Sequence, residues 1–294
     1  MVQRGNDVWS RGATFFERLR YGVTDFANTP PSALTVFDYL DLAVVGGFPD
    51  VVVNRSTSQT RDRWLAAYLA ELTTNDVKLA GLDPDPAKFA RFVQAVAVNS
   101  SRIVEQATLR DAAGISKHTA GVYEDLLEAV FFSERVSAWR SDRLDRLAAL
   151  PKRYVLDSGL FMHLLGVDTD AAAQDPAILG AVLDTFVAMQ LRPELAIQAR
   201  PLRLFHLRDK GGRHEVDLII ELPRGQVIAI EVKATAAPSL DDARHLIWLR
   251  DRLGKDFLGG IVLHTGPSSF MLSHNIVATP ISTLWQCPQL KETA

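Results

Sequence analysis

The chain has 294 residues, of which 47% are hydrophobic, so it is long enough to bury more than one hydrophobic core. Its formal net charge of -3 excludes the global basic excess of proteins that bind nucleic acid mainly through phosphate groups. The single cysteine, Cys287, excludes internal disulfide bonds and a cysteine-based zinc site, and it fits a reducing cytosol. The N-terminus lacks an apolar signal segment, and the apolar runs are far shorter than a membrane span. We therefore expect a cytoplasmic protein of two globular domains without a membrane partner.

Residues 1–35 mix arginine, glycine, asparagine and proline around one short helical stretch at 15–19, which predicts a linker or the tail of a missing domain. Residues 36–165 are predicted to form a mainly helical domain, because apolar side chains recur at helical spacing between 33 and 72 and again between 89 and 97. An Asp-Pro-Asp-Pro run that ends at Pro86 marks the start of the second helical segment, since proline fixes the first turn of a helix.

Residues 108–119 have the rhythm of a helix-turn-helix motif. Gly114 is expected to end a short helix, and Ser116 is expected to cap the next one. Two β-like segments follow at 131–136 and 153–157, and the loop between them is basic. Two helices followed by a two-stranded wing predict a winged helix within the first domain.

The charges of the predicted winged helix leave two functions open. Lys117 and His118 at the start of the second helix, with Arg140 and Arg143 in the basic loop, are the candidate nucleic-acid-binding residues. The same helix also carries three acidic side chains, which we expect to face outward and to repel phosphate. They are Glu124, Asp125 and Glu128. We therefore expect the module either to contact DNA or to pack against another protein, including a second copy of the chain.

Residues 177–285 are predicted to form a second domain, because the periodicity of the apolar residues changes there. A helix near 179–191 precedes three strands at 202–207, 215–221 and 226–232, and the short turns between the strands predict a meander. A helix at 240–253, capped by Ser239 or Asp241, and a strand at 260–264 complete the order. The whole chain is thus expected to be an α/β (α+β) protein, with its helices mainly in the first part and a mixed sheet flanked by helices in the second.

The second and third strands of the meander carry residues that suit hydrolytic chemistry. Because side chains alternate along a strand, Asp217 on one strand is expected beside Glu231 and Lys233 on the next. Metal-assisted hydrolysis of a phosphodiester needs hard oxygen ligands for Mg²⁺ and an ammonium group to orient water. The alternative is a solvated face on which the acids and the lysine pair across the strands, as we expect of Glu215.

Asp217 followed by Glu231-Val232-Lys233 resembles the signature of PD-(D/E)XK nucleases, which have a restriction-endonuclease-like fold. The wider chain, from about 33 to 285, is similar to a family of bacterial and archaeal ATPases with an uncharacterised C-terminal region, in which a winged helix precedes a nuclease-like domain. This resemblance rests on five short sequence segments. They are Gly46-Gly47-Phe48-Pro49, Lys152-Arg153-Tyr154-Val155-Leu156-Asp157-Ser158-Gly159-Leu160, Leu183-Asp184-Thr185-Phe186-Val187, His214-Glu215-Val216-Asp217 and Ile230-Glu231-Val232-Lys233.

The resemblance implies that Asp217 and Glu231 are catalytic residues that hold Mg²⁺, that Lys233 positions or activates water, and that Asp184 supports the metal shell. The chain departs from the family in two ways: it contains no Gly-x-x-x-x-Gly-Lys-Ser/Thr loop, so we expect no ATP site, and it has Asp184 where the family has glutamate. Residues 1–35 then represent a remnant of the missing AAA+ ATPase domain, and such an ATPase is an expected partner. The alternative function is a non-catalytic accessory module that binds DNA or protein.

Overall fold

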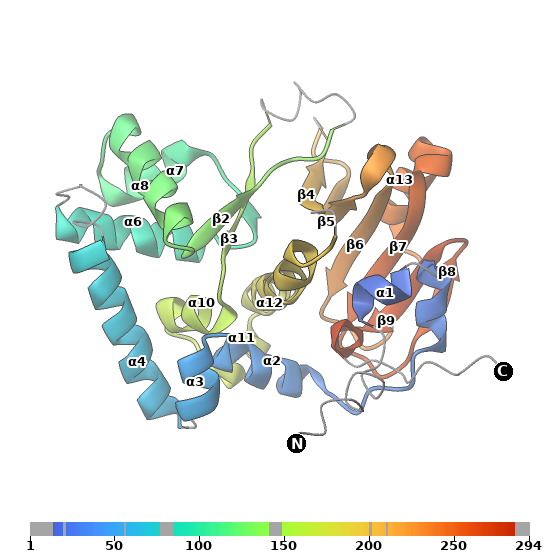
Figure 1. Cartoon of the computed structure of the whole chain (residues 1–294), viewed down its shortest axis with the longest axis horizontal. Helices are drawn as coiled ribbons and strands as arrows, with labels where there is room; N and C mark the ends of the chain where they lie inside the picture. The colour runs from blue at the N-terminus through green and yellow to red at the C-terminus, as the bar shows by residue number, and fades with distance from the viewer. Residues whose placement is uncertain are drawn as a thin grey trace, which may run out of the picture. The chain divides into compact units, whose positions relative to one another are not determined.

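Helices dominate the first part of the chain and a β-sheet dominates the second, which confirms the predicted mixed α/β fold (Figure 1). Contacts divide the chain into two units, one of residues 37–189 and one of residues 1–36 with 190–294. No helix in the described part of the chain is long and apolar enough to cross a membrane. The computed structural model describes residues 14–19, 22–55, 57–76, 85–140, 149–199, 202–209 and 211–285.

The unit of residues 37–189 is mainly helical, as the sequence predicts. The predicted proline-marked helix is present, with Asp85 as its N-cap and Pro86 as its first residue. The helices and helical turns of this unit are α2 (Val36–Val45), α3 (Pro49–Asn54), α4 (Ser58–Glu71), the π-helical turn η2 (Leu72–Asp76), α6 (Pro86–Val98), α7 (Gln106–Ala113), α8 (Lys117–Ala129), α10 (Ser158–Leu165), α11 (Thr169–Gln174) and most of α12 (Pro176–Ala196).

The turn between α7 and α8 forms as predicted. Gly114 ends α7 in the left-handed conformation, with φ of 64°, which glycine adopts without steric cost. The Ser116 side chain accepts a hydrogen bond from the backbone N–H of Thr119 and so caps α8. A small antiparallel sheet accompanies these helices, in the order β1-β3-β2. Its strands are β1 (Arg102–Ile103), β2 (Ser133–Val136) and β3 (Lys152–Val155).

The unit of residues 1–36 and 190–294 is built on a six-stranded mixed sheet in the order β4-β5-β6-β7-β9-β8. The first three strands pair antiparallel in sequence, which confirms the predicted meander. β7 pairs parallel with β6 on one side and with β9 on the other, and β8 pairs antiparallel with β9. The strands are β4 (Arg203–Arg208), β5 (Glu215–Glu221), β6 (Val227–Lys233), β7 (Phe257–His264), β8 (Phe270–Ser273) and β9 (Ile276–Pro280). β8 and β9 are not among the strands expected from the sequence.

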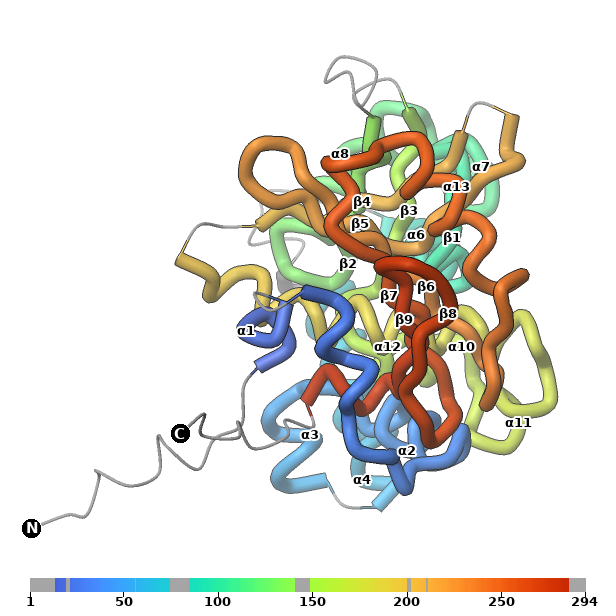
Figure 2. The backbone as a smooth tube through the Cα atoms, turned by 90° about the vertical axis from the view of Figure 1, so that its right-hand side faces the viewer, coloured from blue at the N-terminus to red at the C-terminus, as the bar shows by residue number. Residues whose placement is uncertain are grey.

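Two adjacent glycines of β7 show how the two faces of this sheet are covered. A Cβ atom on Gly260 would lie 3.2 Å from the side chain of Leu246, whereas one on Gly259 would collide with Val23. Since adjacent residues of a strand point to opposite faces, α13 (Arg244–Leu253) covers one face and η1 (Val23–Asn28) covers the other. In Figure 2 the strands run between α13 and the N-terminal segment, which also contains α1 (Phe15–Leu19). The described part of the predicted linker thus packs onto the C-terminal sheet.

The predicted start of the helix at 240 was wrong, because α13 begins at Arg244. Asp242 accepts hydrogen bonds from the backbone N–H and the hydroxyl of Ser239, and the N–H of Ala243 donates to Leu240, so these residues form turns instead. The remaining elements of this unit are the short helical turns η3 (Pro223–Gly225), η4 (Gly254–Asp256) and η5 (Ile281–Leu284).

Candidate functional site

Asp217 and Glu231 lie together on neighbouring strands of the six-stranded sheet. The antiparallel register pairs Leu218 with Ile230, and one further step along both strands brings Asp217 opposite Glu231. The Asp217 carboxylate accepts a hydrogen bond of 3.0 Å from the backbone N–H of Val232. The structure therefore places the two predicted carboxylates on one face of the sheet.

A β-bulge lies at Asp217. Phe205 of β4 pairs with Ile219 of β5, but Leu207 pairs with Val216, so two residues of β5 lie opposite one residue of β4. A bulge of this kind bends the strand and turns a side chain in a new direction. The backbone pairing of β5 with β6 also ends at this point, and the Asp217 side chain supplies the acceptor for the next N–H of β6. The bulge therefore aims Asp217 at the end of β6.

Glu231 is a buried acid, with 3% of its surface exposed. One carboxylate oxygen, Oε2, lies 2.9 Å from Nζ of Lys233, while the other, Oε1, is buried without a hydrogen-bond partner among the described residues. Burial raises the pKa of Glu231 well above its usual value, the nearby charge of Asp217 raises it further, and Lys233 opposes the rise. Burial alone lowers the pKa of Lys233, but the charges of Glu231 and Asp217 prevail and raise it. Lys233 is therefore a cation beside two acids.

These residues fit a hard divalent cation. Two carboxyl groups repel each other at close range, and Oε1 of Glu231 is a buried acceptor to which no described residue donates. The described residues contain no group of three or more histidine, cysteine or acidic side chains that could hold a metal ion. Mg²⁺ nevertheless uses one or two protein carboxylates and keeps several water molecules, so Asp217 and Glu231 suffice as its protein ligands.

Asp184, the fourth predicted residue, belongs to the unit of residues 37–189. There its carboxylate lies 2.5 Å from Nζ of Lys152 and accepts a hydrogen bond from the Tyr154 hydroxyl. Lys152 is 2% exposed and Asp184 is 7% exposed, so the pair is a buried structural ion pair. The lysine is thereby part of the protein core, while the role of Asp184 in a metal shell stays a prediction.

The candidate nucleic-acid-binding residues also lie in the unit of residues 37–189. Lys117 and His118 are exposed in the first turn of α8. Arg140 is partly exposed and has contacts within the protein. Arg143 falls outside the described residues. The described candidate residues for DNA contact therefore lie in two places, the first turn of α8 and the start of the loop after β2.

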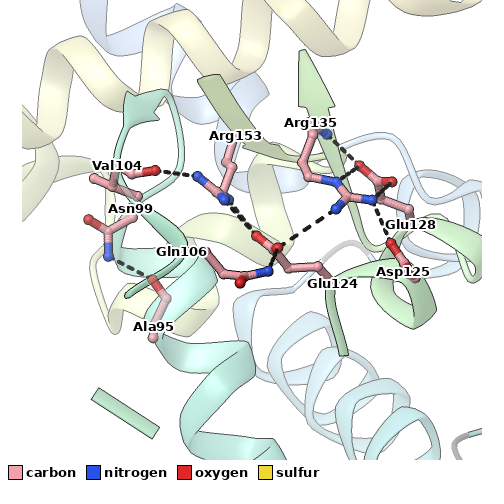
Figure 3. A network of polar contacts seen from close by, with 9 residues as sticks. All are labelled: Ala95, Asn99, Val104, Gln106, Glu124, Asp125, Glu128, Arg135 and Arg153. Atoms are coloured by element: carbon pink, nitrogen blue, oxygen red, sulfur yellow. Dashed lines mark hydrogen bonds and ion pairs between the residues drawn. The ribbon is translucent and has the colours of Figure 1, made fainter. Parts of the chain in front are cut away.

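The expectation that Glu124 faces outward was wrong, because its side chain is 4% exposed. Figure 3 shows it at the centre of a polar network. Its carboxylate accepts a hydrogen bond from the Gln106 side chain and forms an ion pair of 2.7 Å with Arg153. Arg135 reaches the other two acids of α8, Asp125 at 2.7 Å and Glu128 at 2.6 Å. These carboxylates raise the pKa of Arg135, the hydrogen bond to Glu128 most of all. The acids of α8 are therefore paired with arginines of the small sheet.

Three aromatic side chains that are not among the predicted site residues lie near Asp217. His214, directly before β5, stacks on Trp248 of α13 with ring centres 4.1 Å apart and planes at 6°. His245 lies 5.7 Å from His214. Burial lowers the pKa of His245, and nearby cations including Lys233 lower it further, while Asp217 opposes them. The three-residue spacing of His245 and Trp248 already placed them on one face of a helix, but the sequence did not show which strand that face meets.

Two domain families match successive parts of the chain. Residues 36–171 match a domain of unknown function (DUF8612), and residues 179–284 match a domain of unknown function (DUF4143), a C-terminal domain type associated with ATPases. The chain is similar to uncharacterized protein Mb2031c of Mycobacterium bovis and uncharacterized protein Rv2008c of Mycobacterium tuberculosis, each 27% identical over 235 residues. These matches cover 80% of the chain and 51% of each relative, so the chain spans about half the length of the curated relatives it matches.

A solved structure with some likeness to the chain is that of protein VC1899 from Vibrio cholerae. The likeness covers 85% of the chain and 58% of that protein, at 16% sequence identity and with a TM-score of 0.24. A TM-score of this size carries no argument about the fold or the function.

Proposed function

We propose that the chain is a DNA-associated protein whose C-terminal unit hydrolyses phosphodiester bonds with the help of Mg²⁺. The observation that carries this proposal is the cluster of Asp217, Glu231 and Lys233, in which a buried carboxylate oxygen has no hydrogen-bond partner among the residues that the structure describes. An unpartnered buried acceptor costs free energy in a protein without bound metal, and a divalent cation relieves that cost. The helix, three-stranded meander, helix and strand around the cluster also follow the order of PD-(D/E)XK nucleases, which supports the proposal.

The residues of the cluster have separate roles in this proposal. Asp217 and Glu231 hold the cation, which supplies Lewis-acid stabilisation of the charge that develops on the phosphate. Lys233 orients the attacking water and stabilises negative charge. Its raised pKa makes it a poor proton acceptor, so positioning suits it better than activating water. The hydrogen bond from Val232 to Asp217 holds this carboxylate in place while it binds.

The unit of residues 37–189 is the proposed DNA-binding part. Its order of α6, β1, α7, α8, β2 and β3, with the last two strands paired, is that of a winged helix. Lys117 and His118 are exposed where the second helix of the motif begins. Arg135 and Arg153 offset the acids of α8, which reduces the repulsion of phosphate that the sequence suggested. We propose that the first turn of α8 contacts DNA.

The nuclease proposal is tested by incubating the purified chain with supercoiled plasmid and linear DNA in the presence of Mg²⁺ or Mn²⁺. Asp217→Asn keeps an oxygen that accepts the Val232 N–H but removes a metal-binding charge, so we expect cleavage to fall roughly 100-fold or more. Lys233→Ala is expected to lower cleavage by a similar factor.

Glu215→Gln is the matched control. Glu215 lies on the same strand, but its side chain is 42% exposed and its contact with Arg208 is 3.7 Å long. We expect this variant to cleave as fast as the unmodified chain. Metal-dependent cleavage that survives Asp217→Asn would contradict the proposal, since it would place the reaction elsewhere.

A non-catalytic interaction module is the second candidate. Two observations favour it: Asp184 is already paired with Lys152 and Tyr154, and the described residues contain no group of three or more histidine, cysteine or acidic side chains that could hold a metal ion. In this function the chain binds DNA or a protein. An ATPase is one such protein, because the domain type that matches residues 179–284 is associated with ATPases. An absence of cleavage together with DNA retardation that Asp217→Asn leaves unchanged would favour this candidate.

A further inference from the structure

The aromatic side chains beside Asp217 form a second feature of the candidate site. Trp248 is partly exposed, and His214 covers one face of its indole ring at 4.1 Å. The guanidinium of Arg252, whose side chain is exposed, lies 5.8 Å from the centre of the same ring. This distance is at the outer limit of a cation–π contact and is wider than the separation of stacked rings. Arg252 is therefore a loose neighbour of Trp248.

The imidazoles beside Trp248 have binding capacity that the protein does not use. Nδ1 of His214 and Nδ1 of His245 are buried, and neither has a hydrogen-bond partner among the described residues. Ring nitrogens are able to donate to or accept from a ligand, depending on the tautomer. Arg213 and Arg244, the residues directly before these histidines in the sequence, are exposed cations, and Arg244 is paired with Asp241 at 2.9 Å. Flat rings, unused polar atoms and arginines together suit a planar, hydrogen-bonding group attached to an anionic chain.

The position of this feature relates it to the carboxyl cluster. His214 is three residues before Asp217 along an extended strand, a path of about 10 Å. The ring centre of His245 lies 5.7 Å from that of His214, and His245 is also close enough to Lys233 and Asp217 for their charges to act on its pKa. A nucleotide whose base rests on Trp248 is thus close to a phosphate at the carboxyl cluster.

We propose that the Trp248 ring, backed by His214 and flanked by Arg252, is a stacking platform for an unpaired nucleobase. This inference rests on the proposed nuclease function and gives it a substrate class, an unpaired strand of DNA. Bases inside a duplex are stacked on each other and do not present a face to a side chain, whereas every unpaired base does. The chain therefore binds a single strand at this site in preference to a duplex.

The test compares the binding of a fluorescein-labelled single-stranded DNA oligonucleotide with that of the same sequence as a duplex, in EDTA so that no cleavage occurs. Stacking on an aromatic side chain contributes about 1–3 kcal/mol per base, so Trp248→Leu is expected to weaken single-strand binding roughly 10-fold and to leave duplex binding unchanged. Trp248→Phe keeps a flat ring and is expected to stay within about threefold of the unmodified chain. Trp64→Leu is the matched control, because Trp64 also stacks, on Tyr68, but in the other unit.

Circular dichroism shows whether Trp248→Leu is folded. If it is not, tryptophan fluorescence of the unmodified chain decides the matter, because stacking of a base on Trp248 quenches emission that Trp248→Phe lacks. Equal losses of single-strand and duplex binding, no loss of either, or quenching that persists in Trp248→Phe would overturn the inference. Cleavage by the unmodified chain and by Asp217→Asn is measured separately. A single-strand preference in an unmodified chain that does not cleave rejects the nuclease and keeps the platform. Cleavage by the unmodified chain that Asp217→Asn abolishes, without a single-strand preference, keeps the nuclease and rejects the platform.

Discussion

Both units of the protein bury ionisable side chains, but the two units differ in how many hydrogen-bond and ion-pair partners these side chains have. In the unit of residues 37–189, Glu124 is paired with Arg153, and Asp184 is paired with Lys152 and Tyr154. In the C-terminal unit, Glu231 has one oxygen on Lys233 and another without a partner among the described residues. A buried ionisable group whose polar atoms all have partners is a structural element, whereas one that lacks a partner at a strand end indicates a binding site. The two regions therefore differ in whether their buried acids have partners, and not in whether the acids are buried.

The largest expected effect comes from breaking the satisfied network. Arg153→Met leaves the buried Glu124 carboxylate without its closest cation, and removal of one partner from a buried ion pair destabilises a protein by about 3 kcal/mol or more. Urea unfolding followed by circular dichroism measures the loss. The matched control is Arg110→Met, because the pair of Arg110 with Asp111 is largely exposed and is expected to contribute less than about 1 kcal/mol. Equal losses of unfolding free energy in both variants would show that the buried network stabilises the protein no more than an exposed ion pair does.

The second prediction concerns His264, a buried side chain of β7 that pairs in register with Lys233. Its Nδ1 accepts a hydrogen bond of 3.0 Å from Gly266, and burial lowers its pKa to about 4 from 6.5. Below pH 6.5 the unfolded chain binds a proton that the folded protein does not, so stability is lost as the pH falls from 6.5 to 4, by roughly 3 kcal/mol.

His264→Asn retains an acceptor for Gly266 and does not titrate. We expect its unfolding free energy to be lower at all pH values, because the side chain is smaller, but to fall less between pH 6.5 and pH 4. Chemical unfolding at several pH values measures the slope, and His118→Asn, at an exposed position, is the control. The prediction fails when the slopes of the unmodified chain and of His264→Asn coincide.

A smaller effect is expected at Asp157, another buried acid that has its partners. Its carboxylate accepts hydrogen bonds from the N–H groups of Leu160, at 2.8 Å, and Gly47, at 2.7 Å. Asp157→Ala removes a helix cap and a link to the turn after α2, so we expect a loss of about 2 kcal/mol in unfolding free energy. Asp168→Ala removes only the exposed cap of α11 and is expected to cost about 1 kcal/mol or less. Thermal unfolding of the two variants side by side checks this order.

The smallest expected effect has the opposite sign. The pKa of Glu231 is raised in the folded protein, so the folded state keeps a proton that the unfolded chain releases, and stability falls as the pH rises from about 4.5 through the raised pKa. Glu231→Gln removes this fall and is expected to increase unfolding free energy by on the order of 1 kcal/mol, more at pH 8 than at pH 5. Melting curves at both pH values measure it, with Glu215→Gln as the control. A destabilised Glu231→Gln would mean that Glu231 is a structural residue like Glu124.

Much of the fold was predictable because it depends on local periodicity. The meander of β4, β5 and β6 follows from alternating side chains and short turns, and the end of α7 at Gly114 follows from the backbone freedom of glycine. The start of α13 was misplaced because Ser239 and Asp242 bond to each other in a turn. The strands β8 and β9 were missed because their short apolar stretches are held by pairing with distant β7.

The sequence by itself determined which acids and lysine share a face, since the period of a strand placed Asp217 beside Glu231 and Lys233. Only the tertiary structure decided which charges are satisfied. It turned Glu124 inward onto Arg153, joined Asp184 to Lys152, and stacked His214 on Trp248. It also left an oxygen of Glu231 without a hydrogen-bond partner in the described part of the chain. These contacts join residues far apart along the chain, and no local pattern encodes the partner that a side chain finds when distant elements pack together.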